Sequence, residues 1–311
     1  MKLPKLIGLA TLGWTLTCGP AGAQAVSDAD LQKRANAILT LMGFALTPDV
    51  TTGSLSLTDQ AAGNPYFRQT SLSGGGTFKA VPLYLEGTLA YGRYDPTFAA
   101  SDGQATRPIS VKWDSLLGTG GVGWDFPIAQ GLVLRPIFNF SLGRLESQAT
   151  VPAATTQGSS SRSTLDFLGS GRLNAYGLGG SLVLDYERYR PENEIDVEVR
   201  YSNIYLQSFD SSRAVEGHAD AQTFSLWSRY RAPTGLTALE RPVRYVLEFA
   251  HTRFLGDLEG ALGFTYMNSF GAGLELDSSN HDVYVTRTRL MVRYKAGNNA
   301  IGWALGLGLS F

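Results

Sequence analysis

The last eleven residues read Ile-Gly-Trp-Ala-Leu-Gly-Leu-Gly-Leu-Ser-Phe, from Ile301 to Phe311. Large apolar side chains alternate here with glycine, alanine and serine, which is the period of a β-strand. A half-buried strand of a soluble protein carries polar side chains on its second face, whereas this second face is small. The pattern therefore indicates a strand whose large residues face an apolar medium and whose small residues face a crowded or wet interior.

Four upstream segments repeat the alternation, with charged or small polar residues on the second face: 130–146, 171–187, 193–209 and 282–295. Apolar side chains outside and polar side chains inside are typical of transmembrane β-barrels. We therefore predict an all-β chain. The predicted strands are 50–58, 66–78, 81–94, 108–126, 130–146, 171–187, 193–209, 218–232, 241–254, 260–277, 282–295 and 300–311.

These twelve strands place the long connections, rich in serine and threonine, at one end of the barrel and the mostly shorter connections at the other. Bacterial barrels have an even number of strands, short periplasmic turns and longer external loops. The predicted fold class is thus a twelve-stranded antiparallel transmembrane β-barrel with one N-terminal α-helix, which we expect in the lumen.

Two strands need a specific interpretation. Segment 260–277 is kept whole because the apolar residues from Leu262 onward keep one parity, and because dividing it would make the strand number odd. In strand 108–126 the apolar residues change parity between Trp113 and Trp124. One inserted residue exchanges the two faces of a strand and glycine tolerates it, so we expect a β-bulge near residues 118–121.

Composition excludes several classes of protein. The 311 residues include 26 Lys and Arg against 27 Asp and Glu, so the chain is not a basic nucleic-acid binder. One cysteine rules out a disulfide framework and a zinc site built on several thiolates. The three histidines are scattered, and outside the N-terminus no apolar run is long enough for a membrane-spanning helix. We expect no catalytic, cofactor-binding or metal-binding residues.

The N-terminus has the layout of a secretory signal peptide. Lys2 and Lys5 precede an apolar stretch, and Ala21 and Ala23 form a small-residue signal with cleavage expected after Ala23. Residues 28–43 then repeat apolar side chains at helical spacing and predict an amphipathic helix. The expected domains are a signal peptide (1–23), an N-terminal helical segment and possible pore plug (24–47) and an outer-membrane β-barrel (48–311).

Five short motifs carry a family resemblance: Pro82–Gly87, Gly123–Pro127, Arg244–Glu248, Gly273–Asp277 and Ser310-Phe311. They resemble the solitary outer-membrane autotransporter-like β-barrel domain, from about Asp30 to Phe311. The resemblance implies a translocator barrel with an N-terminal helix threading its lumen. In autotransporters a large passenger lies upstream, but here only a few residues separate the cleavage site from the helix. We therefore expect a barrel without a passenger.

The resemblance also implies a location and partners. We expect a multi-pass β-barrel in the outer membrane of a Gram-negative-type cell, surrounded by outer-membrane lipids. The C-terminus resembles the insertion signal that the barrel-assembly machinery recognises, and the residues that would carry this signal are Trp303, Leu307, Leu309 and Phe311. No nucleic-acid partner is expected.

Charged residues at inward positions of the predicted strands are the candidate lumen residues. They are Arg135, Asp185, Asp196, Glu198, Arg200, Arg229, Arg231, Arg244, Glu248, Glu275, Arg287 and Arg289. Their signs alternate around the predicted wall, which is expected of paired, hydrated charges in a polar barrel interior. The alternative is a belt that binds a charged solute or a constriction that selects ions.

The helix is expected to plug the lumen, and placement in the periplasm or on the membrane surface is the alternative. Lys33 and Arg34 would then meet Glu86, Glu275 or another lumen acid. The glycines on inward faces that would leave space for the helix are Gly177, Gly179, Gly263, Gly271, Gly273, Gly302, Gly306 and Gly308. The expected function is that of a mainly structural, helix-plugged barrel without a passenger.

Three other functions are considered. A porin-like small-solute channel would conduct steadily. A surface adhesin or interaction protein would act through the loops 95–107 and 147–170. An enzyme would need His218 and Asp220 to approach His251, which we regard as chance proximity among many charged residues.

Overall fold

The structure is a computed structural model that describes residues 28–44, 51–59, 66–101, 106–149, 162–279 and 285–310. The predicted signal peptide, with Ala21 and Ala23, lies outside the described residues, as does the terminal Phe311. Neither of the two α-helices in the described part of the chain is long and apolar enough to cross a membrane.

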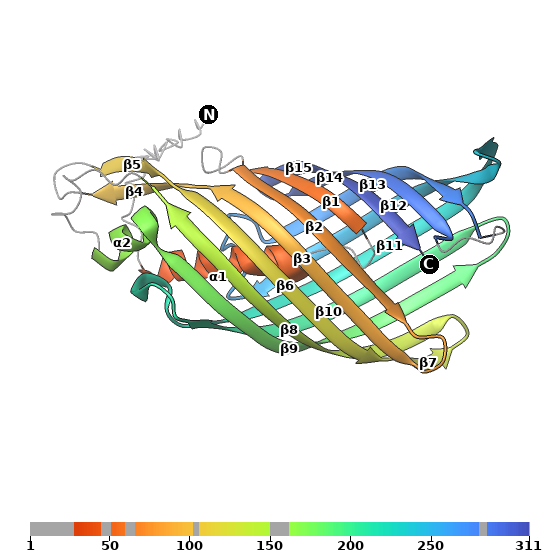
Figure 1. Cartoon of the computed structure of the whole chain (residues 1–311), viewed down its shortest axis with the longest axis horizontal. Helices are drawn as coiled ribbons and strands as arrows, with labels where there is room; N and C mark the ends of the chain where they lie inside the picture. The colour runs from red at the N-terminus through yellow and green to blue at the C-terminus, as the bar shows by residue number, and fades with distance from the viewer. Residues whose placement is uncertain are drawn as a thin grey trace, which may run out of the picture.

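The described strands form a closed antiparallel barrel (Figure 1). Its strands are β1 (Thr51–Asp59), β2 (Tyr66–Thr77), β3 (Leu83–Asp95), β6 (Lys112–Trp124), β7 (Phe126–Ala129), β8 (Leu132–Gln148), β9 (Arg172–Tyr189), β10 (Glu194–Phe209), β11 (His218–Ala238), β12 (Arg241–Gly256), β13 (Tyr266–Asp277), β14 (Arg287–Gly297) and β15 (Ala300–Ser310). β6 and β7 both pair with β8 and form one strand interrupted at Asp125. Pairing of β1 with β15 closes the ring, so the described residues confirm a barrel of twelve strands.

The two ends of the barrel differ in their connections (Figure 1). We call the end with the β7–β8, β9–β10 and β11–β12 turns the short-turn end, and the opposite end the long-loop end. The long-loop end carries the hairpin of β4 (Thr97–Ser101) and β5 (Thr106–Ser110), the helix α2 (Arg162–Ser170) and the 3-10 turn η2 (Arg213–Val215). In bacterial barrels the short turns face the periplasm.

Several strand boundaries were predicted wrongly, and two of them are informative. β13 begins at Tyr266, not at residue 260, and Phe264 lies buried in the preceding loop. Phe264 shares the parity of Phe270 and Leu274, which face outward on β13, but it is itself buried, so the match of parity was a coincidence. β11 continues to Ala238, so the predicted gap 233–240 shrinks to a turn of two residues. Both turn residues, Leu239 and Glu240, have positive φ angles of 51° and 61°, as a tight hairpin turn between twisted strands requires.

The predicted bulge in strand 108–126 is wrong. β6 pairs with β3 and with β8 without a register shift from Trp113 to Gly123. Trp113 faces inward and is fully buried, whereas Val122 and Trp124 face outward and are exposed. Apolar side chains thus occupy both faces of one regular strand, because the inner face near the long-loop end lines an apolar core.

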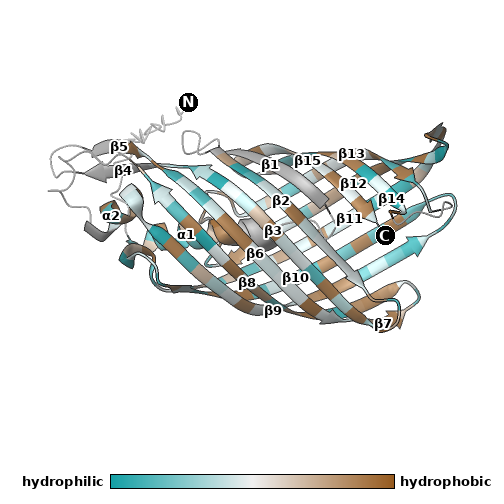
Figure 2. Ribbon diagram, viewed as in Figure 1, coloured by the Kyte–Doolittle hydropathy of each residue, from teal (hydrophilic) through white to brown (hydrophobic). Residues whose placement is uncertain are grey.

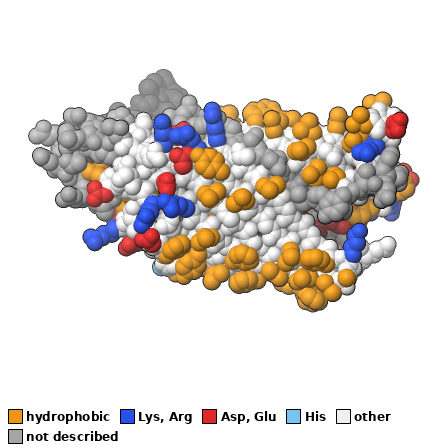
Figure 3. Space-filling view, viewed as in Figure 1, with side chains coloured by type: hydrophobic (Ala, Val, Ile, Leu, Met, Phe, Trp, Pro, Cys, Tyr) orange, Lys and Arg blue, Asp and Glu red, His pale blue; other side chains and the backbone are white. Residues whose placement is uncertain are grey.

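The outer surface is apolar over the strands near the short-turn end (Figures 2 and 3). On β8 the outward residues Phe138, Phe140 and Leu142 are all about half exposed or more, which in water would be an unusually large apolar surface. Arg144 and Glu146 follow on the same outward face and begin a charged band toward the long-loop end. β8 has 17 residues, more than the roughly 9–11 that cross a bilayer. The barrel therefore extends past the membrane at its long-loop end.

The helix α1 (Asp28–Phe44) lies inside the barrel, in its long-loop half (Figure 1). It contacts β3, β6 and β8 on one side and β11 on the other, together with α2 and η2. Leu31, Ala35, Ile38 and Leu39 are buried in one apolar cluster with inward residues of the wall, among them Trp113. The long-loop half of the lumen is thus an apolar core built around the helix.

Candidate functional site

The short-turn half of the lumen is filled by charged side chains of the barrel wall. All twelve predicted lumen residues lie there on inward faces, and their side chains are buried or largely buried. The wall positions follow from the two-residue period of each strand, which turns alternate side chains inward. What the structure adds is the set of partners that each charge meets.

Glu194, the first residue of β10, joins three arginines. Its carboxylate oxygens lie 2.6 Å from Arg244 Nη1, 2.6 Å from Arg287 Nη1 and 3.1 Å from Arg231 Nη2. Sequence reasoning missed Glu194 because it directly follows a turn, where a charged residue is ordinarily solvent-exposed. Its inward parity with Asp196 and Glu198 was the available signal.

Glu248 on β12 and Glu275 on β13 each have an arginine partner. Glu248 accepts hydrogen bonds from Arg229 Nε at 2.9 Å and from Arg293 Nε at 2.7 Å. Glu275, which is fully buried, lies 2.8 Å from Arg289 Nη2. Charges buried to this extent are stable only when they are paired and hydrogen-bonded.

A second group of pairs lies on the strands β3 to β10. Arg200 donates to both carboxylate oxygens of Glu86, at 2.8 Å and 2.5 Å, and Asn139 donates to the same carboxylate at 2.9 Å. Arg135 pairs with Asp125 and also lies 3.2 Å from Asp185. Asp125 was absent from the predicted lumen charges, and Glu86 was named only as a lumen acid that the helix could meet.

Two of these ion pairs cross the lumen. Arg200 and Glu86 join β10 to β3, which are separated in the ring by β6, β8 and β9. Arg287 and Glu194 join β14 to β10, which are separated by β11, β12 and β13. In a ring of twelve strands such partners are four strand positions apart, a third of the circumference, so their side chains span a chord of the interior.

The signs of the lumen charges are separated rather than alternating. On the described inward faces from β3 to β10 acids predominate: Glu86, Asp125, Asp185, Glu187, Glu194, Asp196 and Glu198 against Arg135 and Arg200. From β11 to β14 bases predominate: Arg229, Arg231, Arg244, Arg287, Arg289, Arg293 and Lys295 against Glu248, Glu275 and Asp277. The predicted alternation compared a smaller set of charges strand by strand, and that set lacked Asp125, Glu187 and Glu194.

Apolar contacts bury one face of the helix, and the two wall acids named as its possible partners bind other residues. Glu86 and Glu275 are bonded to arginines of the wall, and Lys33 is exposed. The glycine that admits the helix is Gly143 on β8, where a Cβ atom would come within 3.0 Å of a methyl group of Leu39. Gly143 was not among the glycines predicted to make room. Its inward parity between Leu142 and Arg144 was the only signal.

The histidines do not come together. His218 lies at the long-loop end of β11, exposed and stacked on Tyr205 with 5.4 Å between the ring centroids. His251 on β12 is opposite Leu226 and lies 2.8 Å from Asn268 Oδ1. His218 and Leu226 are eight positions apart along β11, which is a length of roughly 27 Å at the rise of a β-strand. The two histidines therefore cannot share one substrate.

A closed antiparallel ring with an apolar belt outside and charges inside is an outer-membrane β-barrel. No protein-family model matches the sequence, and no curated protein matches it.

Solved structures with a similar architecture include three autotransporter domains. The β domain of the Bordetella autotransporter BrkA is 15% identical, with 85% of this chain and 100% of that chain covered and a TM-score of 0.49. The translocator domain of NalP from Neisseria meningitidis is 12% identical, with 91% and 96% covered and a TM-score of 0.47. The transport unit of AIDA-I from Escherichia coli is 13% identical, with 92% and 100% covered and a TM-score of 0.48. The chain is thus similar in architecture to autotransporter translocator barrels, and identities of this size extend the likeness no further.

Proposed function

We propose that this chain is a mainly structural outer-membrane barrel that is closed at rest, with α1 as the plug of its long-loop half. The observation that carries the proposal is the burial of one face of α1 in the apolar core of the lumen. Leu31 is 0% exposed and Ile38 and Leu39 are each 1% exposed. A helix that merely rested in a wet pore would keep these side chains hydrated.

The contacts of α1 support a stably bound plug. Trp113 from β6 lies in the same core and donates a hydrogen bond to Ser147 Oγ at 3.0 Å. Ser147 in turn donates to the carbonyl of Leu168 in α2 at 2.9 Å. Asp28 at the start of α1 accepts a hydrogen bond from Thr164 of α2. Wall, plug and long-loop helix thus form one connected unit.

The partners expected from the sequence belong to the same proposal. Trp303 and Leu307 of β15 point outward and are well exposed on the apolar belt, where membrane lipid would cover them. Leu309 follows on the same parity, and Phe311 lies outside the described residues. We propose that the barrel-assembly machinery recognises this C-terminal strand before the strand is inserted into the lipid.

The surface-interaction alternative stays a prediction. Part of the two loops that it invokes is folded, as the β4–β5 hairpin and as α2, and the rest lies outside the described residues. Nothing in the described part favours a particular partner for these loops.

Single-channel conductance in a planar bilayer tests the plug. We expect the refolded mature barrel to be silent and a variant that lacks residues 24–45 to conduct. Equal, steady conductance from both forms would contradict the proposal and favour the small-solute channel. If neither form conducted, the ion pairs of the wall would be enough to close the lumen, and the proposal that α1 is the plug would be contradicted.

A point variant keeps the test independent of the deletion. Leu39→Glu places a charge in the apolar core and is expected to release the helix and give channel openings. Lys33→Ala, on the exposed side of α1, is the matched control and is expected to stay silent. Gel electrophoresis in sodium dodecyl sulfate shows whether each variant has assembled, because a folded barrel migrates differently from its heat-denatured form when the sample is not heated.

A further inference from the structure

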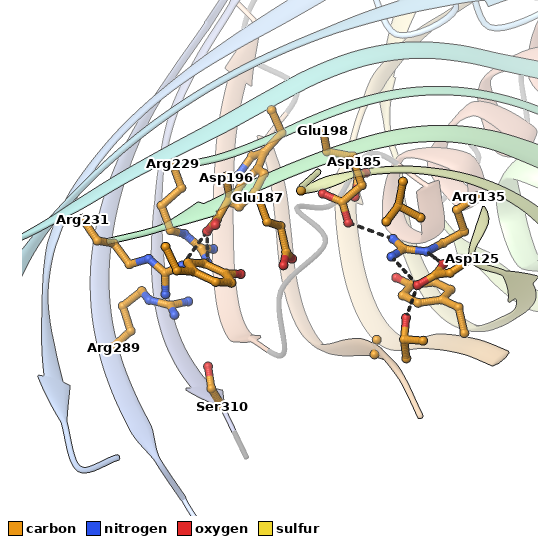
Figure 4. A pocket seen from close by; sticks show the side chains of 18 residues that line it. Asp125, Arg135, Asp185, Glu187, Asp196, Glu198, Arg229, Arg231, Arg289 and Ser310 are labelled. Carbon is orange, nitrogen blue, oxygen red and sulfur yellow. Dashed lines mark hydrogen bonds and ion pairs between the residues drawn. The ribbon is translucent and has the colours of Figure 1, made fainter. Parts of the chain in front are cut away.

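A cavity of about 470 Å³ lies in the lumen at the short-turn end (Figure 4). Gly131 of the β7–β8 turn and Ser310 of β15 are among its lining residues, which places it at the mouth opposite α1. Its volume is within the range of pockets that bind small organic molecules.

The cavity has two walls of opposite charge (Figure 4). We call the first the acidic wall; it consists of Asp125, Asp185, Glu187 and Glu198 with the single cation Arg135. The second is the basic wall and consists of Arg229, Arg231 and Arg289 with the single anion Asp196. Arg229, Arg231 and Arg289 are also paired with Glu248, Glu194 and Glu275 outside the cavity. An excess of each sign remains when all the described inward charges are counted, because acids predominate on β3 to β10 and bases on β11 to β14. A solute in the cavity therefore lies in a field directed across the lumen.

Several polar groups of the cavity are buried without a partner. Asp196 Oδ1, Trp227 Nε1 and Arg231 Nε have no hydrogen-bond partner among the described residues, although their residues are more than nine-tenths buried. Glu198 is also more than nine-tenths buried, and Arg200, its neighbour on the same inward face, is bonded to Glu86 through both terminal nitrogens. Buried polar groups are ordinarily satisfied, so unsatisfied ones that line a cavity indicate groups that a ligand would meet.

We propose that this cavity binds a zwitterionic solute of small-peptide size, with its ammonium group toward the acidic wall and its carboxylate toward the basic wall. Glu198 is the acceptor for the ammonium group. The unpartnered Nε–H group of Arg231 and the Trp227 N–H group are the donors for the carboxylate, since hydrogen bonds to an ionised acceptor are the stronger ones. The bound solute would give these residues the partners that the wall does not provide.

The separation of charge argues against ligands of a single sign. A simple anion would gain contact with the three arginines of the basic wall but would face the carboxylates opposite. A simple cation would gain contact with the carboxylates of the acidic wall but would face the three arginines opposite. Juxtaposed like charges cost binding energy, so only a ligand that carries both signs satisfies both walls.

Binding of three matched probes to the full refolded chain tests the proposal by isothermal titration calorimetry. Triglycine carries both end charges, N-acetyl-triglycine carries only the carboxylate, and triglycine amide carries only the ammonium group. We expect triglycine to bind at least tenfold more tightly than either capped probe. Equal binding of the acetylated probe would show an anion site, equal binding of the amide a cation site, and absence of binding no site; each result overturns the proposal.

Substitutions then assign the ends of the ligand. Glu198→Gln is expected to lower triglycine affinity about tenfold and to leave the affinity for N-acetyl-triglycine unchanged. Trp227→Phe keeps an aromatic side chain but removes the N–H donor. It is expected to lower the affinity for triglycine and for the acetylated probe alike. Glu146→Gln, in the charged band of the outer surface, is the control and is expected to leave the affinity for all three probes unchanged. An unchanged triglycine affinity in both cavity variants would overturn the assignment.

The cavity lies at the end of the barrel opposite α1, so the proposal does not rest on the plug. The calorimetric test needs no conductance, and a barrel that conducts could still bind triglycine. Failure of one proposal is therefore distinguishable from failure of the other.

Discussion

Glu86 shows how much one residue contributes to a closed lumen. It accepts hydrogen bonds from Arg200, Asn139 and Tyr84, which come from β10, β8 and β3. Its side chain and that of Arg200 are each 16% exposed, so neither charge is well hydrated. The bidentate geometry offsets the desolvation of both groups, because two parallel charge-assisted hydrogen bonds form at once.

Replacement of Glu86 by glutamine is expected to destabilise the barrel by about 3 kcal/mol, because it leaves the guanidinium of Arg200 buried without its counter-charge. Denaturant unfolding of the refolded barrel in lipid vesicles measures the change. The exposed pair Arg144–Glu146, with side chains 55% and 45% exposed, is the control. Glu146→Gln is expected to cost less than about 1 kcal/mol. Equal losses in the two variants would show that the Glu86 pair is effectively solvated.

At this scale the sequence predicts which side chains point inward but not which of them meet. The strand period placed Arg200 in the lumen, yet its partner Glu86 lies more than a hundred residues away in the chain. The pairing depends on how twelve strands are staggered around the ring, and the stagger is a property of the closed barrel. Acids at strand ends, such as Glu194 and Asp125, were missed because turn neighbours make them resemble surface residues.

Among the elements, α1 was the easiest to predict and its surroundings the hardest. The expected helix 28–43 and the observed one, Asp28–Phe44, agree to one residue at the C-terminal end. The apolar lining that receives it was not predicted, because an inward Trp113 contradicts the rule that barrel interiors are polar. That contradiction led to a bulge which the chain does not have. Apolar residues on both faces of a barrel strand are better interpreted as a sign that something apolar fills the pore.

Truncation of the buried face of α1 is expected to loosen the helix without unfolding the wall. Ile38→Ala removes buried methyl and methylene groups and leaves a cavity, at a cost of about 2 kcal/mol or more. That cost corresponds to a roughly 30-fold larger population of the undocked helix. Hydrogen exchange of the α1 amides measures it, since local opening exposes them selectively. Lys33→Ala is the control, and an equal acceleration in both variants would show that α1 is not held by its apolar face.

For the whole molecule, the two halves of the lumen are occupied in different ways, and we propose that both contribute to closure. The long-loop half is filled by an apolar core with a helix in it, and the short-turn half is crossed by arginine–carboxylate pairs. The outer surface matches this division, because the apolar belt surrounds the charged half and the charged band begins near the level of the helix (Figure 3). The charged lumen is therefore the part that lies within the membrane, where the wall needs an inner partner for every ionised group.

Closure at both ends predicts that removal of the helix opens the pore only in part. In a variant that lacks residues 24–45, the additional changes Arg200→Gln and Glu86→Gln remove both partners of one cross-lumen bridge together, so neither partner is left without the other. We expect single-channel conductance to rise severalfold above that of the helix-less barrel, because two long charged side chains no longer span the lumen. The same pair of changes in the full chain is expected to leave it silent, since α1 still fills the other half. Conductance of the helix-less barrel that did not change on removal of the bridge would show that the ion pairs leave a free path beside them, and closure would then depend on the helix alone.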